Sequence, residues 1–168
     1  TFTDAAGGDV NASASTVTSY TFAAGTAGNA ASVSQIGSGA TVTLNDDDLG
    51  NVTLDYASGV SSTVLNLGSV SGTVAIGTLA ITDVANVVIN AVGVSGTVGG
   101  TIGTASFDSD LKALTIATSG GEADLTIGTN NIDMQLGGAT SLTVTSNGSA
   151  SITFNAVDLA GSQLTTVN

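Results

Sequence analysis

Histidine, cysteine, arginine, proline and tryptophan are all absent from this sequence of 168 residues. The absence of cysteine excludes a disulfide framework and thiolate metal sites. Most known active sites need a base, a nucleophile or an anion-binding group from histidine, cysteine or arginine, and none of these is present. A serine or threonine nucleophile would have only Lys112 as its base. We therefore predict that the protein is not an enzyme.

Positive charge is almost as scarce. Lys112 is the only basic residue against 13 acidic ones, which gives a net charge of -12. Affinity for nucleic acid comes from lysine and arginine side chains that displace counterions, so a nucleic-acid partner is excluded. The same charge disfavours anionic membranes and favours metal cations as partners. The longest apolar stretch, residues 84–94, contains two asparagines and a glycine and is shorter than the roughly 18 residues of a membrane-spanning helix, so we expect no transmembrane segment.

The sequence is rich in short runs in which apolar residues alternate with threonine, serine or aspartate. Such period-two alternation is the pattern of β-strands. Glycine, asparagine, aspartate and serine separate the runs, and these residues favour turns. The sequence therefore predicts an all-β protein. The apolar residues that open the runs are Val42, Val52, Val74, Leu114, Leu125, Ile132, Leu142 and Ile152.

The apolar pattern repeats at an offset of one hundred residues. Residues 42–44 align with 142–144, and residues 52–54 align with 152–154. Within each copy two strands and two turns take up about 22 residues, which is near the length of one coil in a parallel β-solenoid. Small side chains suit the narrow core of stacked coils. The same strand spacing also fits a β-sandwich, so the predicted fold is a parallel β-solenoid with a β-sandwich as the alternative.

Residues 1–38 lack these regular runs, although they contain Tyr20 and Phe22. We expect this segment to form an irregular N-terminal arm or cap, and residues 39–168 to form the repetitive β domain. The last residues, 164–168, have the pattern of a strand with no terminating signal. We therefore expect the chain to be part of a longer polypeptide.

Several runs rich in threonine, alanine, glycine and valine carry a resemblance to a known family. These are residues 113–118, 141–148 and 162–168. In composition and period, residues 39–168 resemble the bodies of Gram-negative bacterial surface-layer proteins and related secreted proteins of the RTX type. The resemblance implies an extracellular, calcium-dependent, self-assembling coat protein with β-helical parts. The glycine-aspartate nonapeptides that bind calcium in that family are absent from this sequence.

Clustered acidic residues are the candidate metal ligands. Asp46, Asp47 and Asp48 crowd one turn, where adjacent carboxylates repel each other unless a cation or water screens them. Asp108 and Asp110 flank a serine and could chelate from one side of a loop. Calcium suits such groups because it takes six to eight oxygen ligands. The alternative is that these are solvated loops that keep the protein soluble. Further acidic pairs are Asp4 with Asp9 and Glu122 with Asp124.

These features predict an extracellular structural protein of the bacterial cell surface that assembles with itself into a surface layer or filament. Calcium is expected to bridge its acidic turns, and cell-surface polysaccharide is a second expected partner. The alternative is a binding module, such as an adhesin stalk or an ice-binding domain. An ice-binding face would use outward threonines at strand spacing, and the sequence offers Thr43, Thr53, Thr143 and Thr153.

Overall fold

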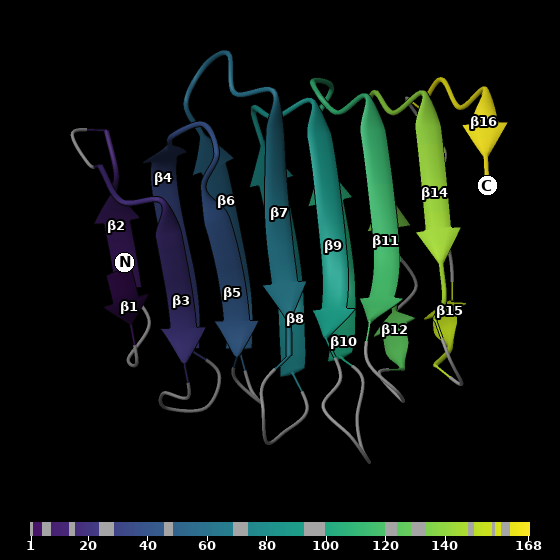
Figure 1. Cartoon of the computed structure of the whole chain (residues 1–168), viewed down its shortest axis with the longest axis horizontal. Coiled ribbons are helices and arrows are strands. Elements are labelled where there is room, and N and C mark those ends of the chain that lie inside the picture. The colour runs from purple at the N-terminus through teal and green to yellow at the C-terminus, as the bar shows by residue number, and fades with distance from the viewer. Residues whose placement is uncertain are drawn as a thin grey trace.

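The computed structural model describes residues 2–4, 8–13, 16–23, 29–45, 49–68, 74–92, 100–119, 124–128, 134–147, 150–155, 157–158 and 162–168. Regular secondary structure in these residues consists of β-strands alone (Figure 1). The prediction of an all-β protein is therefore confirmed. The strands are β1 (Phe2–Asp4), β2 (Gly8–Asn11), β3 (Ser19–Ala23), β4 (Asn29–Ile36), β5 (Thr41–Asn45), β6 (Leu49–Tyr56), β7 (Ser62–Leu67), β8 (Val74–Thr82), β9 (Asn86–Val92), β10 (Gly100–Phe107), β11 (Ala113–Ser119), β12 (Leu125–Ile127), β13 (Met134–Gln135), β14 (Ser141–Thr145), β15 (Ile152–Phe154) and β16 (Thr166–Val167).

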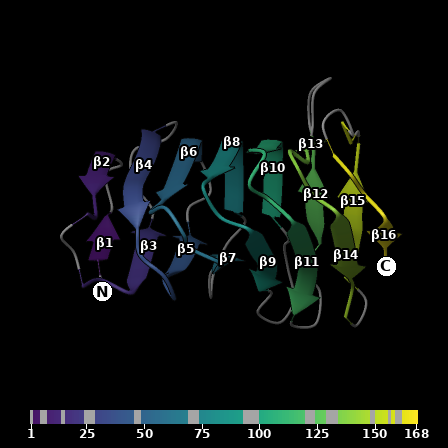
Figure 2. The same ribbon diagram turned by 90° about the horizontal axis from the view of Figure 1, so that it is seen from above.

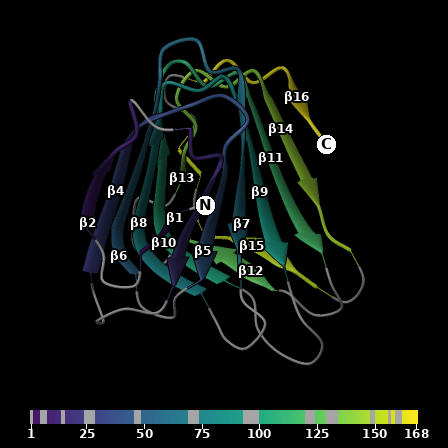
Figure 3. The same cartoon turned by 60° about the vertical axis from the view of Figure 1, so that its left-hand side comes forward.

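The strands form two parallel sheets that face each other. Sheet A has the order β1-β3-β5-β7-β9-β11-β14-β16, and sheet B has the order β15-β12-β10-β8-β6-β4-β2, with β13 paired to β10. Figure 2 shows the two sheets as opposite rows, and Figure 3 shows them enclosing a common interior. Because each strand pairs in parallel with a strand of the next coil, the chain winds as a β-solenoid. The predicted solenoid is confirmed, and the β-sandwich alternative, which needs antiparallel sheets, is not the fold.

The length of a coil explains the repeat in the sequence. Tyr20 pairs with Val42, and Val42 with Leu65, so the early coils take up about 22 residues, as expected. Later coils are longer, since Ile89 pairs with Ile116 and Ile116 with Val144. Val42 and Val144 are therefore four coils apart, and their separation in the sequence exceeds the offset of one hundred by two residues. A shift of two residues keeps the same side of each strand facing inward.

The described residues among 1–38 continue the same two sheets. β1 and β3 belong to sheet A, and β2 and β4 belong to sheet B. The side chains of Tyr20 and Phe22 are each 1% exposed and lie in the same core as the rest of the protein. In the described part of the chain, residues before and after the expected boundary at residue 38 therefore share one core. Serine and alanine dilute the alternation there, but Tyr20 and Phe22 still occupy alternate positions.

The core is built from the inward side chains of alternate strand residues. Leu44, Leu54, Leu65 and Ile89 have no exposed surface at all. Full burial of one such side chain contributes about 1.5–3 kcal/mol, so stacked rows of aliphatic residues stabilise successive coils. The described residues include no helix long and apolar enough to cross a membrane.

One polar pair lies within this core. The hydroxyl groups of Tyr56 and Thr63 are hydrogen-bonded at 2.6 Å. Burial raises the pKa of Tyr56 to about 12, although the bond to Thr63 opposes the shift. The tyrosine is therefore neutral and serves as a buried hydrogen-bonding group.

Candidate metal site at the stacked corners

The candidate site lies where the chain leaves sheet B and turns toward sheet A. Asp83 directly follows β8, and Asp108 directly follows β10 of the next coil. Both corners use residues that favour turns. Asp83 has a positive φ of 61°, a backbone conformation that aspartate tolerates better than most residues. The backbone N–H of Asp110 donates to Asp108 Oδ1 at 3.0 Å, which closes the second turn.

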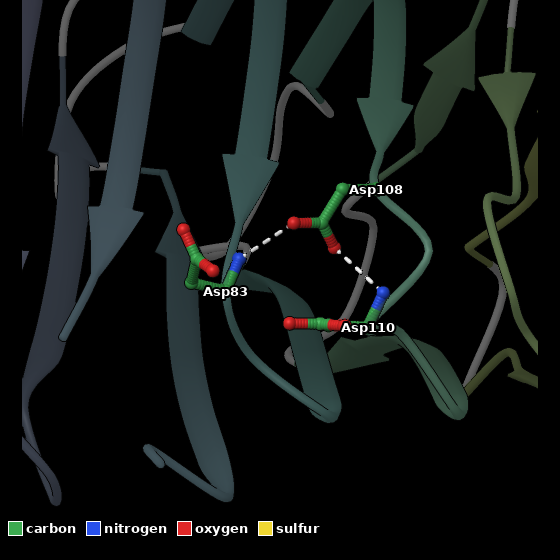
Figure 4. Close-up of side chains that lie close together, drawn as sticks. All are labelled: Asp83, Asp108 and Asp110. Carbon is green, nitrogen blue, oxygen red and sulfur yellow. Dashed lines mark hydrogen bonds between the residues drawn. The ribbon is translucent and has the colours of Figure 1, made fainter. Parts of the chain in front are cut away.

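Stacking of the two corners brings three carboxyl groups together. Oxygens of Asp83, Asp108 and Asp110 all lie within 4.8 Å of one another (Figure 4). The backbone N–H of Asp83 also donates to Asp108 Oδ2 at 2.8 Å, which connects the two coils. Asp83 and Asp110 are exposed, and Asp108 is half-buried. We refer to these three residues as the corner triad.

A fourth carboxyl group lies next to the corner triad. Asp55 is near the end of β6, one coil before Asp83, and its Oδ1 accepts a hydrogen bond from Thr82 Oγ1 at 3.1 Å. A hydrogen bond shared with the Asp55 carboxyl is the largest cause that raises the pKa of Asp83 above its ordinary value of 3.8. Desolvation and repulsion by the surrounding carboxylates raise it further. The charged form of Asp83 is therefore less favoured in the folded protein than in the unfolded chain.

Lys112, the only basic side chain in the sequence, lies close to this corner in the chain. Its Nζ donates to the carbonyl oxygen of Ser109 at 3.1 Å. The charged groups that raise the pKa of Asp83 are the carboxyl groups of Asp108, Asp55 and Asp110. A cation bound among them would relieve their repulsion.

The structure bears on the predicted metal ligands in different ways. Asp108 and Asp110 come together as the sequence suggested, because they lie in one tight turn. Asp46, Asp47 and Asp48 lie outside the described residues. Sequence reasoning did not identify Asp83. It precedes Asp108 by 25 residues, about the length of one coil, and that spacing is the signal that could have revealed it.

The weaker acidic candidates are placed separately. Asp9 is exposed on β2, and Asp4 is on β1. Asp124 Oδ1 accepts hydrogen bonds from the backbone N–H and the Oγ of Ser151, at 2.6 and 2.8 Å. These bonds lower the pKa of Asp124. Its carboxylate thus ties two coils together through protein donors. Glu122 lies outside the described residues.

The four threonines considered for an ice-binding face all lie on outer surfaces. Thr43 and Thr143 are half-buried on sheet A, whereas Thr53 and Thr153 are exposed on sheet B. The outward orientation was expected from their apolar neighbours in the sequence. Because the four residues divide between opposite sheets, they do not form one flat face.

Comparison with protein-family models, curated proteins and solved structures finds no match to this chain. The chemistry of the site therefore rests on its geometry. Three carboxyl groups at the corner offer hard oxygen ligands of the kind that calcium and magnesium prefer. Backbone carbonyls and water would have to supply the remaining ligands, because calcium takes six to eight.

Proposed function

We propose that the protein is a structural component of an extracellular assembly at the bacterial cell surface, a layer or filament in which calcium bridges acidic turns. The observation that carries this proposal is the corner triad, in which successive coils contribute carboxyl groups within 4.8 Å of one another. A divalent cation held by Asp83 and Asp108 would join two coils and remove repulsion at the same time.

A mechanical role fits the continuous two-sheet architecture of the chain. Sheets A and B take up strands from β1 to β16, and one core runs through them. Stacked coils of this kind form a stiff, extended body in which each coil contacts its neighbours. The sequence offers no histidine, cysteine or arginine for catalysis, so the proposal assigns no reaction to the protein.

Charge makes cations important for assembly. Each copy carries a net charge of -12 and a single lysine, so copies offer too few cations to pair mainly through salt bridges. Bound calcium would lower the net charge of each copy and allow closer approach. Acidic turns would then act as calcium-dependent contacts between coils and between copies, and cell-surface polysaccharide remains a proposed second partner.

The test compares the protein with calcium and with a chelator. At a calcium concentration of 100 times the dissociation constant, binding to the folded state alone stabilises it by about 2.7 kcal/mol. For a domain of this size that corresponds to a rise in melting temperature of roughly 5–10 °C. We expect this rise, and we expect light scattering and electron micrographs to show ordered assembly in calcium but not in chelator.

Variants assign the effect to a site. Asp83→Asn combined with Asp108→Asn should remove most of the calcium-dependent rise, whereas Asp9→Asn removes one exposed carboxylate elsewhere and should leave it intact. A triple change of Asp46, Asp47 and Asp48 to asparagine tests the other predicted turn. A melting temperature and a scattering signal that are the same in calcium and in chelator would contradict the calcium part of the proposal. Protein that stays monomeric in every condition would contradict the assembly part and favour an adhesin stalk.

A further inference from the structure

The outer face of sheet A is free of charged residues from β3 to β14. We call the outward residues of these six strands the uncharged face. The register of the sheet arranges them in rows that run across the coils. No described element crosses this face (Figure 1). Its two central rows are Ser19, Thr41, Val64, Val88, Thr115 and Thr143, and Thr21, Thr43, Asn66, Asn90, Ala117 and Thr145.

The charged side chains lie elsewhere in the described part of the chain. They occupy sheet B, the corners, the connections between strands and the edge strand β1. Strands β2 and β6 of sheet B carry Asp9 and Asp55, whereas in sheet A only the edge strand β1, outside the uncharged face, carries a charged residue, Asp4. The net charge of -12 does not by itself predict that one face of the protein lacks charged residues. The charged residues concerned are Asp4, Asp9, Asp55, Asp83, Asp108, Asp110, Lys112, Asp124 and Asp158.

We propose that the uncharged face of sheet A packs against the same face of a second copy of this chain. Copies with a charge of -12 repel each other, and repulsion is weakest where the facing surfaces carry no charge and acidic groups are kept at the rim. This inference deepens the proposed function, because it names a contact surface for self-assembly. It requires neither calcium nor the corner triad.

The composition of the face suits a packed contact. Val64 and Val88 are neighbours at its centre, on β7 and β9. Beside them Asn90 Nδ2 donates to Asn66 Oδ1 at 3.3 Å, so the two amides partly satisfy each other within the sheet. Threonines on the flanking strands give polar edges. An apolar centre with a polar rim is the usual anatomy of a protein interface, and rows of β-branched side chains can interdigitate between facing sheets.

The area of the face sets the expected strength. Six strands lie about 4.8 Å apart, and each is about five residues long with a rise of about 3.3 Å per residue. Together they cover roughly 24 by 17 Å, or about 400 Å² per copy in plan. Side-chain relief and the neighbouring β16 increase this, so a pair buries on the order of 1,000 Å², near the lower limit for a specific interface. Pairing is therefore expected to be weak and to depend on protein concentration.

The position of the acidic corner favours one relative orientation. Asp83 and Asp110 precede β9 and β11, so their carboxylates lie at the starting end of these two central strands of sheet A. A two-fold axis that makes facing strands antiparallel places the two acidic ends on opposite sides of the pair. Parallel facing strands would bring them together and raise the repulsion. We therefore expect the antiparallel arrangement.

The experiment is sedimentation equilibrium of the whole chain in chelator, from micromolar to millimolar protein, with a matched pair of variants. Thr115→Asp places a carboxylate in the middle of the uncharged face on β11, where Thr115 is half-buried between Val88 and Thr143. Thr78→Asp makes the same change on β8 of sheet B, where Thr78 is half-buried between Asn51 and Thr104. Both variants have the same net charge, so a difference in their dimerisation is due to which face carries the new carboxylate.

We expect the wild type to dimerise reversibly, Thr115→Asp to weaken dimerisation at least tenfold, and Thr78→Asp to change it less than threefold. Thr115→Asn, which has the shape of aspartate without its charge, should retain pairing, and circular dichroism checks that each variant is folded. If Thr115→Asp does not fold, Thr43→Asp tests the same face. A wild type that stays monomeric at millimolar concentration overturns the inference, as does equal weakening by Thr115→Asp and Thr78→Asp. Monomeric protein that shapes ice crystals would assign the face to ice. Calcium-independent dimers would support this inference even where the calcium proposal fails.

Discussion

Gly77 on β8 offers a test of how tightly neighbouring coils are packed. It lies opposite Gly50 of the preceding coil and Gly103 of the following one, because Ile76 and Thr78 on either side of it are paired in both ladders. A Cβ atom added at Gly77 would lie 2.8 Å from the backbone oxygen of Gly50 and 3.4 Å from its carbonyl carbon. Backbone oxygen in a paired strand cannot turn aside as a flexible side chain can. Two coils would have to move apart locally.

Two opposing terms decide the sign of the Gly77→Ala effect. Replacing glycine by alanine at a compatible φ stabilises a protein by about 0.4–1 kcal/mol, because the unfolded chain loses conformational freedom. Overpacking a well-packed site costs typically about 1–3 kcal/mol. Since the contact is with backbone, the second term should exceed the first. We expect Gly77→Ala to lower the free energy of unfolding by about 1–2 kcal/mol.

Gly37→Ala is the matched control. Nothing lies within 4 Å of a Cβ atom added at Gly37, and its φ is not positive. The entropic term alone then applies, so this variant should be more stable than the wild type by about 0.4–1 kcal/mol. Urea unfolding followed by circular dichroism gives both values, and equal slopes in urea confirm that the unfolded states are comparable. A Gly77→Ala variant as stable as Gly37→Ala would refute the reasoning.

Two carboxyl groups should respond to pH in opposite directions. The pKa of Asp83 is raised in the folded state by the neighbouring carboxyls, so its ionisation destabilises the fold as the pH rises above about 4. Asp83→Asn should therefore be more stable than the wild type at neutral pH in chelator and should lose this advantage on acidification. Urea midpoints measured across the pH range would show this change. A difference in midpoint that stays constant with pH would contradict the prediction. The pKa of Asp124 is lowered by its bonds from Ser151, so its contribution to stability is lost as the pH falls through its folded pKa. Ser151→Ala should raise that pKa toward 3.8 in carboxyl NMR titrations, and an unchanged value would show that the side-chain bond does not matter.

The sequence alone was sufficient for strands with a regular alternation, such as β5, and for the side of such a strand that faces inward. Val42 and Leu44 alternate with threonine, and both are fully buried. Alternation predicts this because successive strand residues point to opposite sides, so the pattern is a local property of the chain. The coil length could also be estimated, because solenoid neighbours are separated by a nearly constant number of residues.

The N-terminal segment shows where local patterns fail. Tyr20 and Phe22 occupy alternate positions, but serine and alanine around them weaken the pattern. Their burial follows from pairing with β5, so it depends on a neighbouring coil. The sequence left both the solenoid and the sandwich open for the same reason. Strand spacing is local, whereas parallel or antiparallel pairing is decided by which distant strands meet.

The corner triad and the uncharged face were decided by the tertiary structure. Asp108 and Asp110 are close in sequence, but Asp83 joins them only because one coil stacks on the next. Likewise Val64 and Val88 become neighbours through the pairing of β7 with β9. The sequence determines the residues available in each coil and the side on which they lie. The register between coils, fixed by packing of the shared core, determines which of them come within contact distance.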